Sequence, residues 1–279
     1  RVDRGGIEAA RVAQEMEPAI ADRDVADLVA QDHVDAGGRF RVARARELLA
    51  HRWRGVESAR LLARNGMAAL CYDPIGQGER YQLLAKEGDR TTFEDAPQVK
   101  VPHPAARFLC ITEHTLTAIS STLVGSNAAQ FRIWDGMRVI DYLQSRKDII
   151  PDKIGCTGNS GGGTETAYLM ALDDRILAAA PGCYLTTFKN LVEQRGPQDG
   201  EQNIFGQIAF GMDEADYCIM RAPKPTLICA GTRDATFDFA GTMEVFSEAK
   251  RFYSRLGFPE HLDIAAPDAP HGFTLQLRE

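Results

Sequence analysis

The segment around Ser160 contains residues whose types and spacing could perform nucleophilic chemistry. Gly158, Ser160 and Gly162 fit the pattern G-x-S-x-G, with a short apolar run before it and a helix-like stretch, residues 164–172, after it. In this strand–turn–helix context the serine sits at a sharp, strained turn. Its neighbours two positions away must lack side chains, because the strand and the helix nearly touch there. The pattern predicts a serine nucleophile for acyl transfer.

Two later segments supply the other groups that such a serine needs. Asp234 comes after the predicted strand 226–230, and His271 comes after the predicted strand 262–266. The chain order of serine, acid and histidine is the order of α/β-hydrolases. Each candidate lies just past the C-terminal end of a strand, where open α/β sheets place their sites. We therefore expect Ser160, Asp234 and His271 to form a catalytic triad.

Each member of this triad has a defined role in ester hydrolysis. His271 would accept the proton of the Ser160 hydroxyl and return it to the leaving alcohol, while Asp234 would orient the imidazole. The backbone N–H of Gly161 is the expected oxyanion donor, and the backbone of residues 52–55 is a candidate for the second donor. This machinery needs no metal and no cofactor.

Structural roles compete with these catalytic ones. Ser160 could be a helix N-cap, and His271 could merely end the last strand. Asp238 is an alternative acid, and either aspartate could be a turn residue or a helix cap; Asp234 is favoured because it directly follows its strand. Glu201 could line a pocket or satisfy buried backbone groups, and both interpretations stay open.

The elements that must position these residues alternate along the chain. The predicted helices cover residues 56–65, 128–146, 164–172 and 242–256, and the predicted strands cover residues 67–72, 153–157, 176–180, 226–230 and 262–266. Nearly continuous apolar strands separated by helices indicate a parallel sheet covered on both faces. The predicted fold class is α/β, with a mostly parallel, doubly wound sheet.

Three stretches depart from this alternation. Residues 1–55 are predicted to be an atypical, helical N-terminal segment, and residues 56–279 the catalytic domain. No clear apolar strand precedes residue 67, and three explanations stay open: a shortened sheet, a substituted N-terminal region, or a sequence that is a fragment. Residues 74–126 and 185–222 are long insertions, and the second contains four aromatic residues: Phe188, Phe205, Phe210 and Tyr217. Each insertion could be a lid or substrate wall, or a packed surface subdomain with aromatic anchors.

Composition narrows the function classes. The chain has 279 residues, 44% of them hydrophobic and 25% charged, which is ordinary for one globular domain. A net charge of −7 without a basic run argues against a nucleic-acid partner. No apolar run reaches the roughly 18 residues of a membrane span, and the N-terminus lacks the apolar core of a signal peptide, although a leader removed by processing stays open.

Cysteine usage bears on the compartment. The six cysteines form no C-x-x-C pair, and Cys71, Cys156 and Cys229 fall in predicted buried strands, where a thiol behaves as a small hydrophobe. We interpret all six as reduced and expect a cytoplasmic chain. The histidines make no cluster with metal-ligand spacing. The expected partner is a small-molecule ester, with a homo-oligomer as an open alternative to a monomer.

With these residues placed, the chain resembles the α/β-hydrolase superfamily, specifically its acetyl xylan esterase-like branch. The resemblance covers residues 56–279 and rests on the motifs at residues 72–80, 158–163, 199–203, 231–234 and 271–272. It implies hydrolysis of short-chain, acetyl-type esters through an acyl-enzyme, with Ser160 as nucleophile, Asp234 as acid and His271 as base. In the first motif, Asp73 and residues 79–80 are interpreted as a structural ion pair and turn.

Two other functions compete with the esterase. A peptidase or amidase could use the same triad, and a non-catalytic binding protein could keep the fold without a working oxyanion hole. A haloalkane dehalogenase is disfavoured, because the elbow carries Ser160 rather than an aspartate nucleophile.

Overall fold

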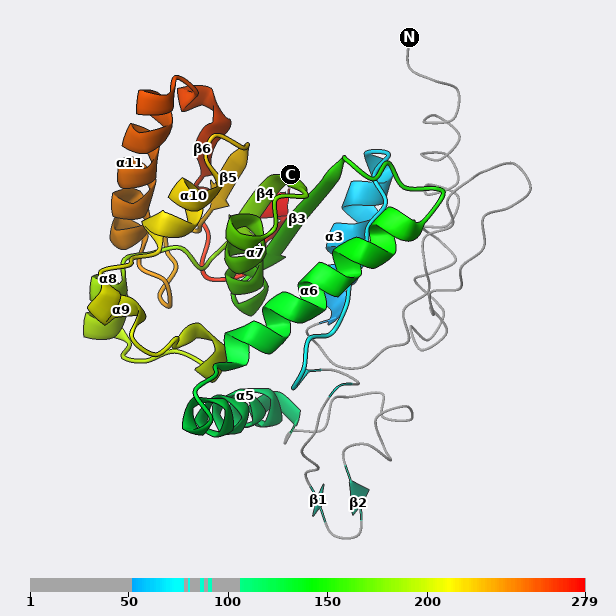
Figure 1. Ribbon diagram of the computed structural model, residues 1–279, viewed down its shortest axis with the longest axis vertical. Coiled ribbons are helices and arrows are strands. Elements are labelled where there is room, and N and C mark those ends of the chain that lie inside the picture. Colours follow the sequence, from blue (N-terminus) through cyan, green and yellow to red (C-terminus); the bar gives the residue numbers. More distant parts are fainter. Residues whose placement is uncertain (1–51, 78–79, 81–85, 88–89, 92–105, 279) are drawn as a thin grey trace. The chain divides into compact units, whose positions relative to one another are not determined.

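The computed structural model describes residues 52–77, 80, 86–87, 90–91 and 106–278 (Figure 1). The helical segment predicted within residues 1–51 lies outside these residues. The chain divides into two compact units, Arg1–Glu113 and His114–Glu279. Helix α5 (Ala106–Leu123) runs across this division. None of the described helices is long and apolar enough to cross a membrane.

The first unit contains α3 (Arg52–Arg64) and an antiparallel pair of two-residue strands, β1 (Lys86–Glu87) and β2 (Arg90–Thr91). The predicted helix over residues 56–65 is confirmed. The predicted strand over residues 67–72 is wrong, because this stretch forms no ladder with any described residue. Met67 is 51% exposed and Cys71 is also exposed, so the expected burial of Cys71 is wrong too. A short apolar run becomes a strand only where another strand pairs with it.

Residues 72–77 and Arg80, the described part of the motif at residues 72–80, include a turn. The N–H of Gly76, which has φ of +80°, donates to the Arg80 carbonyl at 3.1 Å. The Arg80 guanidinium donates to the Asp73 carbonyl at 3.2 Å. Arg80 thus stabilises the backbone of its own turn. This is a structural role, as the sequence predicts for this motif.

The second unit contains a four-stranded parallel sheet. Its spatial order is the chain order: β3 (Ile154–Asn159), β4 (Ile176–Gly182), β5 (Thr226–Cys229) and β6 (Leu262–Ala265). The four predicted strands of this region are confirmed. In the described part of the chain no strand of this sheet precedes β3. Because each crossover between parallel strands is right-handed, strands in sequential order place their connecting helices on one face.

The helices of this unit connect or flank the strands. The first two are α6 (Ala128–Ser145) and α7 (Gly161–Leu172), before and after β3; between β4 and β5 come α8 (Phe188–Gln194), η3 (Gly200–Gln202), α9 (Gln207–Phe210) and α10 (Ala215–Arg221); α11 (Phe239–Leu256) and η4 (Pro259–His261) precede β6; and α12 (Leu275–Arg278) follows it. The predicted helices over residues 128–146, 164–172 and 242–256 are confirmed.

Two apolar clusters cover opposite faces of the sheet. The larger cluster packs Ile176, Ile228 and Leu262 against buried residues of α7 and α11 such as Tyr168 and Tyr253. Alternate strand positions point to the other face, where a smaller cluster collects Cys183, Cys229 and Leu277. This second face is covered only in part, because Leu177 of β4 and Leu227 of β5 are 48% and 40% exposed. None of the six cysteines, all of which lie in the described residues, forms a disulfide.

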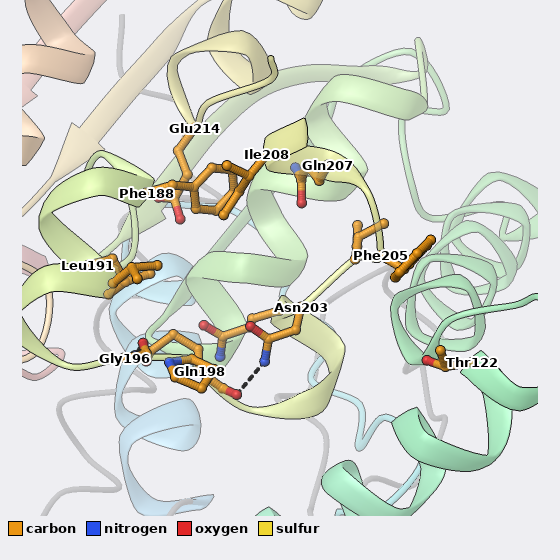
Figure 2. A pocket seen from close by; sticks show the side chains of 14 residues that line it. Thr122, Phe188, Leu191, Gly196, Gln198, Asn203, Phe205, Gln207, Ile208 and Glu214 are labelled. Carbon is orange, nitrogen blue, oxygen red and sulfur yellow. Dashed lines mark hydrogen bonds between the residues drawn. The ribbon is translucent and has the colours of Figure 1, made fainter. Parts of the chain in front are cut away.

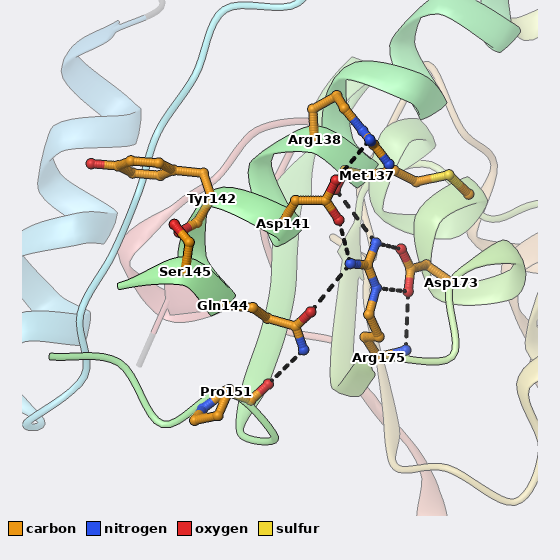
Figure 3. A network of polar contacts seen from close by, with 9 residues as sticks. All are labelled: Met137, Arg138, Asp141, Tyr142, Gln144, Ser145, Pro151, Asp173 and Arg175. Carbon is orange, nitrogen blue, oxygen red and sulfur yellow. Dashed lines mark hydrogen bonds and ion pairs between the residues drawn. The ribbon is translucent and has the colours of Figure 1, made fainter. Parts of the chain in front are cut away.

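Arg175, in the turn between α7 and β4, fixes α6 against that turn (Figure 3). Its guanidinium donates to both carboxylate oxygens of Asp173, at 2.8 and 2.6 Å, and to Asp141 on α6 at 2.5 Å. A further bond of 3.2 Å reaches Gln144. The side-chain hydrogen bonds from Arg175 lower the pKa of Asp173. One planar cation therefore joins two helices next to the start of β4.

Candidate active site

Ser160 sits at a strained strand-to-helix turn. It follows β3 directly and precedes Gly161, the first residue of α7. Its backbone has φ of 59° and ψ of −120°, a region that residues with a Cβ rarely occupy. Two hydrogen bonds hold it there: Ser160 N–H donates to the Gly182 carbonyl at 2.8 Å, and its own carbonyl accepts from Thr164 N–H at 2.9 Å. The side chain makes no capping bond to the helix, which disfavours the N-cap interpretation.

Two glycines allow this turn, and they are not the pair expected from the pattern. A Cβ on Gly158 would lie 2.6 Å from the carbonyl carbon of Gly162, so this position tolerates no side chain. A Cβ on Gly162 would meet no described atom within 4 Å outside its own helix backbone. The second blocked position is Gly163, whose Cβ would collide with the Gly182 carbonyl and approach the Tyr184 side chain to 3.0 Å. The expectation is right for Gly158 and wrong for Gly162, because helix α7 turns its next residue toward β4.

Asp234 and His271 are joined by a direct hydrogen bond. Asp234 Oδ2 lies 2.7 Å from His271 Nδ1, while its Oδ1 accepts from the N–H groups of Thr236 and Phe237 at 2.8 and 3.0 Å. Burial raises the pKa of Asp234, but the bonds from His271, Phe237 and Thr236 outweigh burial, so the pKa lies below its usual value. The ionised carboxylate favours the tautomer with the proton on Nδ1, which leaves the Nε2 lone pair free.

The backbone brings the two loops that carry these residues together. Gly231 follows β5, and a Cβ there would lie 3.0 Å from both the Ala269 carbonyl carbon and the Pro270 oxygen. The N–H of Arg233 donates to the Ala269 carbonyl at 3.0 Å, and Arg233 forms a parallel bridge with Pro270. The glycine thus lets the acid's loop and the histidine's loop pack in direct backbone contact.

The alternative acid has a different place. Asp238 is the N-cap of α11, where its carboxylate accepts from Gly241 N–H at 3.0 Å and from the Asn190 side chain at 3.3 Å. Among the described residues no hydrogen bond joins Ser160 to His271; the bonds of a catalytic triad are often long before substrate binds. The proposed oxyanion donor, Gly161, begins α7, and the first N–H groups of a helix have no partner within the helix. The candidates for the second donor, residues 52–55, lie in the first unit, and that role stays a prediction.

Sequence reasoning missed Cys183, which lies against the acid and the histidine. Its sulfur, a carboxylate oxygen of Asp234 and a ring nitrogen of His271 all lie within 4.8 Å of one another. Its backbone φ is 48°, and its thiol donates to the Gly272 carbonyl at 3.7 Å. Burial raises the pKa of this thiol, so it remains protonated and is a poor metal ligand at neutral pH. The available signal was its position directly after β4, at the same sheet edge as the triad candidates.

Glu201 belongs to a set of buried charges. We use the name buried ion cluster for His114, Arg132, Glu165 and Glu201, which come from α5, α6, α7 and η3. Arg132 Nη1 lies 2.9 Å from Glu165 and 3.5 Å from Glu201, and the His114 ring contacts the Arg132 guanidinium. Glu201 also lies 3.1 Å from His114. The sequence left two roles open for Glu201, lining a pocket or satisfying buried backbone groups. Neither of them is the ionic role that the structure shows.

The two carboxyl groups of the buried ion cluster differ in their affinity for protons. Burial raises the pKa of Glu165 to about 7, although Arg132 opposes this rise. Burial also acts on Glu201, but the hydrogen bond from His114 and the charge of Arg132 outweigh it and lower the pKa. His114, Asp199 and Glu201 also have donor atoms within 4.8 Å of one another. Arg132 pairs with one carboxylate oxygen of Glu201, Oε1, at 3.5 Å, and the other oxygen, Oε2, faces His114 Nδ1.

Comparison with known proteins bears on the fold and on the class of activity. No protein-family model matches the chain. It is 27% identical over 147 residues to YtaP of Bacillus subtilis (strain 168), which is provisionally named a hydrolase; the match covers 52% of this chain and 49% of YtaP. Among solved structures it resembles the methylesterase BT1017, with 25% identity, a TM-score of 0.55, and coverage of 90% of this chain and 45% of the other.

A second solved structure shares the fold. It is a Bacteroides fragilis protein, BF1801, provisionally described as an acetyl xylan esterase, with a TM-score of 0.52 and 16% identity over 74% of this chain and 48% of the other. The chain thus spans about half the length of the proteins it matches. The parallel sheet, the strained serine turn and these likenesses define a protein with the α/β-hydrolase fold. The resemblance to esterases of that superfamily is confirmed.

Proposed function

We propose that this chain is a serine carboxylesterase that hydrolyses small esters with short, acetyl-type acyl groups. The observation that carries the proposal is the pairing of a strained Ser160 at the carboxyl end of β3 with an ionised Asp234 bonded to His271 at 2.7 Å. Strain of this kind persists only where surrounding structure enforces it, and it is concentrated at functional sites. The named hydrolase and esterase relatives favour the same class of reaction.

The proposed reaction proceeds through an acyl-enzyme. The Ser160 oxygen attacks the ester carbonyl carbon and its proton passes to His271 Nε2, while Asp234 stabilises the imidazolium through Nδ1. The Gly161 N–H donates to the developing oxyanion. The C–O bond to the alcohol then breaks, and the alcohol leaves with the proton from His271. A water molecule then attacks the acyl carbon and gives a proton to His271. The bond between the acyl group and Ser160 breaks, Ser160 recovers the proton from His271, and the carboxylic acid leaves.

A series of chromogenic esters with acetyl, butyryl and octanoyl groups tests this proposal. We expect turnover to be fastest with the acetyl ester, and Ser160→Ala to reduce turnover by about 10⁴-fold or more. An organophosphorus reagent that labels activated serines should add its mass to Ser160 in the wild-type protein. Ser247→Ala, a change at an ordinary serine of α11, is the matched control and should keep full activity.

The outcomes separate the alternatives. Activity that survives Ser160→Ala would remove Ser160 from the mechanism. Cleavage of anilides at rates similar to esters would favour the amidase. A folded protein with neither turnover nor serine labelling would favour the non-catalytic binding protein.

A further inference from the structure

Phe237 contacts both members of the hydrogen-bonded pair formed by Asp234 and His271. Its backbone N–H donates to Asp234 Oδ1 at 3.0 Å. Its ring packs against the imidazole of His271, with ring centroids 5.7 Å apart and ring planes inclined by 33°. The side chain of Phe237 is buried, at 3% exposure. One residue thus meets the acid through its backbone and the base through its side chain.

Other aromatic rings hold the Phe237 side chain in place. Tyr184, just after the end of β4, packs edge-on against Phe237, with centroids 5.6 Å apart and an interplanar angle of 67°. Tyr184 also packs edge-on against Tyr168 of α7, at 6.4 Å between centroids. Both tyrosines are buried, and edge-to-face contacts of this kind are favourable beyond the area that they bury. Because α7 directly follows Ser160, a series of ring contacts connects the helix of the candidate nucleophile with the imidazole.

The hydrogen bond between Asp234 and His271 does not fix the imidazole completely. It joins Asp234 Oδ2 to one ring nitrogen, Nδ1, at 2.7 Å, and a single bond leaves the tilt of the ring plane undetermined. The His271 side chain is 28% exposed, whereas that of Asp234 is 1% exposed. An aromatic ring packed against the imidazole restricts this tilt. An apolar ring beside the pair also lowers the local dielectric constant, which strengthens the hydrogen bond.

We propose that Phe237 is a positioning residue, whose ring holds the imidazole of His271 in the orientation that lets Nε2 accept the Ser160 proton. This inference rests on the proposed esterase and goes beyond it, because Phe237 takes no part in the bonds that form and break. Misplacing a catalytic group by about 1 Å lowers a rate by as much as about 100-fold. The ring should therefore contribute to kcat and not to substrate binding.

Two variants of the full chain test this role by kinetics. Phe237→Leu and Phe237→Met keep an apolar side chain without the ring, and both retain the backbone N–H that donates to Asp234. On the acetyl ester, each should lower kcat by about tenfold and leave KM within about twofold of wild type, because the contact orients a group that acts only in the chemical steps. A loss confined to KM, or an unchanged kcat in both variants, would overturn the proposal.

The proton on His271 Nδ1 gives a measurement that needs no turnover. Its NMR signal, assigned by its loss in His271→Gln, should be visible in the wild type at low temperature. In both Phe237 variants this proton should exchange with water about tenfold faster, because an unrestrained imidazole leaves its bond to Asp234 more often. Equal exchange rates, or no protected signal in the wild type, would overturn the proposal. Faster exchange in the variants without ester turnover by the wild type would support the positioning role and reject only the proposed esterase.

Phe188→Leu is the matched control. Phe188 of α8 is also buried, but it lines a cavity of about 280 Å³ that none of Ser160, Asp234 and His271 lines (Figure 2). Urea unfolding should show that Phe188→Leu and Phe237→Leu lose similar stability, because each removes one buried ring. Only Phe237→Leu should lower kcat and speed the exchange of the Nδ1 proton. Equal effects of the two variants on kcat and exchange would assign the loss to general packing and would overturn the proposal.

Discussion

We use the name rim for the sheet edge that carries Ser160, Asp234 and His271. The rim and the buried ion cluster position their side chains in opposite ways. At the rim, each side chain is placed by the backbone next to it: Ser160 by its own strained turn, and Asp234 by the N–H groups two and three residues later. The buried ion cluster instead gathers one side chain from each of four elements, and no two of its members share a motif. We therefore expect changes at the rim to affect catalysis and changes in the cluster to affect stability and its dependence on pH.

The largest expected effect is on kcat, and it discriminates between the two candidates for the catalytic acid, Asp234 and Asp238. Asp234→Asn should lower kcat by about 10⁴-fold, because an amide cannot stabilise the imidazolium and favours the wrong tautomer of His271. Asp238→Asn is the matched control, and its kcat should stay within about threefold of wild type, because asparagine is as good an N-cap as aspartate. Steady-state kinetics on the acetyl ester measures both. The reverse ranking would assign the acid role to Asp238.

The next largest effect is on stability and is expected at two glycines of the serine turn, Gly158 and Gly162. Gly158→Ala should lower the free energy of unfolding by about 2–3 kcal/mol, because the new methyl group meets the rigid backbone of Gly162. Gly162→Ala should leave the free energy of unfolding unchanged or raise it by up to about 1 kcal/mol, because its Cβ has space and alanine favours the helix. Urea unfolding of both variants checks this contrast. Equal destabilisation would mean that the turn is not as tight as described.

The buried ion cluster should make the free energy of unfolding depend on pH. The pKa of Glu165 is about 7 in the folded chain against 4.5 for the free side chain. Between these values the folded state holds a proton that the unfolded state has lost, so stability falls as the pH rises from 4.5 to 7. Glu165→Gln cannot lose a proton there, so the wild-type fall should be larger than the variant's by on the order of 2–3 kcal/mol.

Urea unfolding of wild type and Glu165→Gln at several pH values between 4.5 and 7.5 measures this difference. The control is Glu193→Gln, at a 63%-exposed position of α8, whose curve should run parallel to that of the wild type. Parallel curves for wild type and Glu165→Gln would show that Glu165 does not titrate in this interval.

Much of the second unit could be predicted from local pattern. The four strands of the sheet and helices α6, α7 and α11 agree with the predicted segments to within a few residues, because buried parallel strands and amphipathic helices have distinct periodicities. Residues 67–72 have the same apolar character but form no strand with any described residue, since pairing depends on a distant partner. The local pattern could not supply that partner.

The second insertion shows the same limit. Its aromatic residues look alike in the sequence, yet Phe188 and Tyr217 are buried anchors while Phe205 and Phe210 are exposed. The sequence offered both a packed subdomain and a substrate wall, and the described residues contain features of each. Only the folded chain separates the buried anchors from the exposed side chains, because each position depends on which helix packs beneath it.

The sequence by itself determined the fold class and the candidates for the reactive groups, because the serine turn and the strand-end positions of Asp234 and His271 are encoded by a few neighbouring residues. The tertiary structure alone decided that Asp234 rather than Asp238 meets the imidazole, that Gly163 rather than Gly162 is the blocked glycine, and that Glu201 joins Arg132 and His114. These outcomes depend on contacts between elements far apart in the chain, and a local pattern of residues contains no information about which distant element will lie opposite.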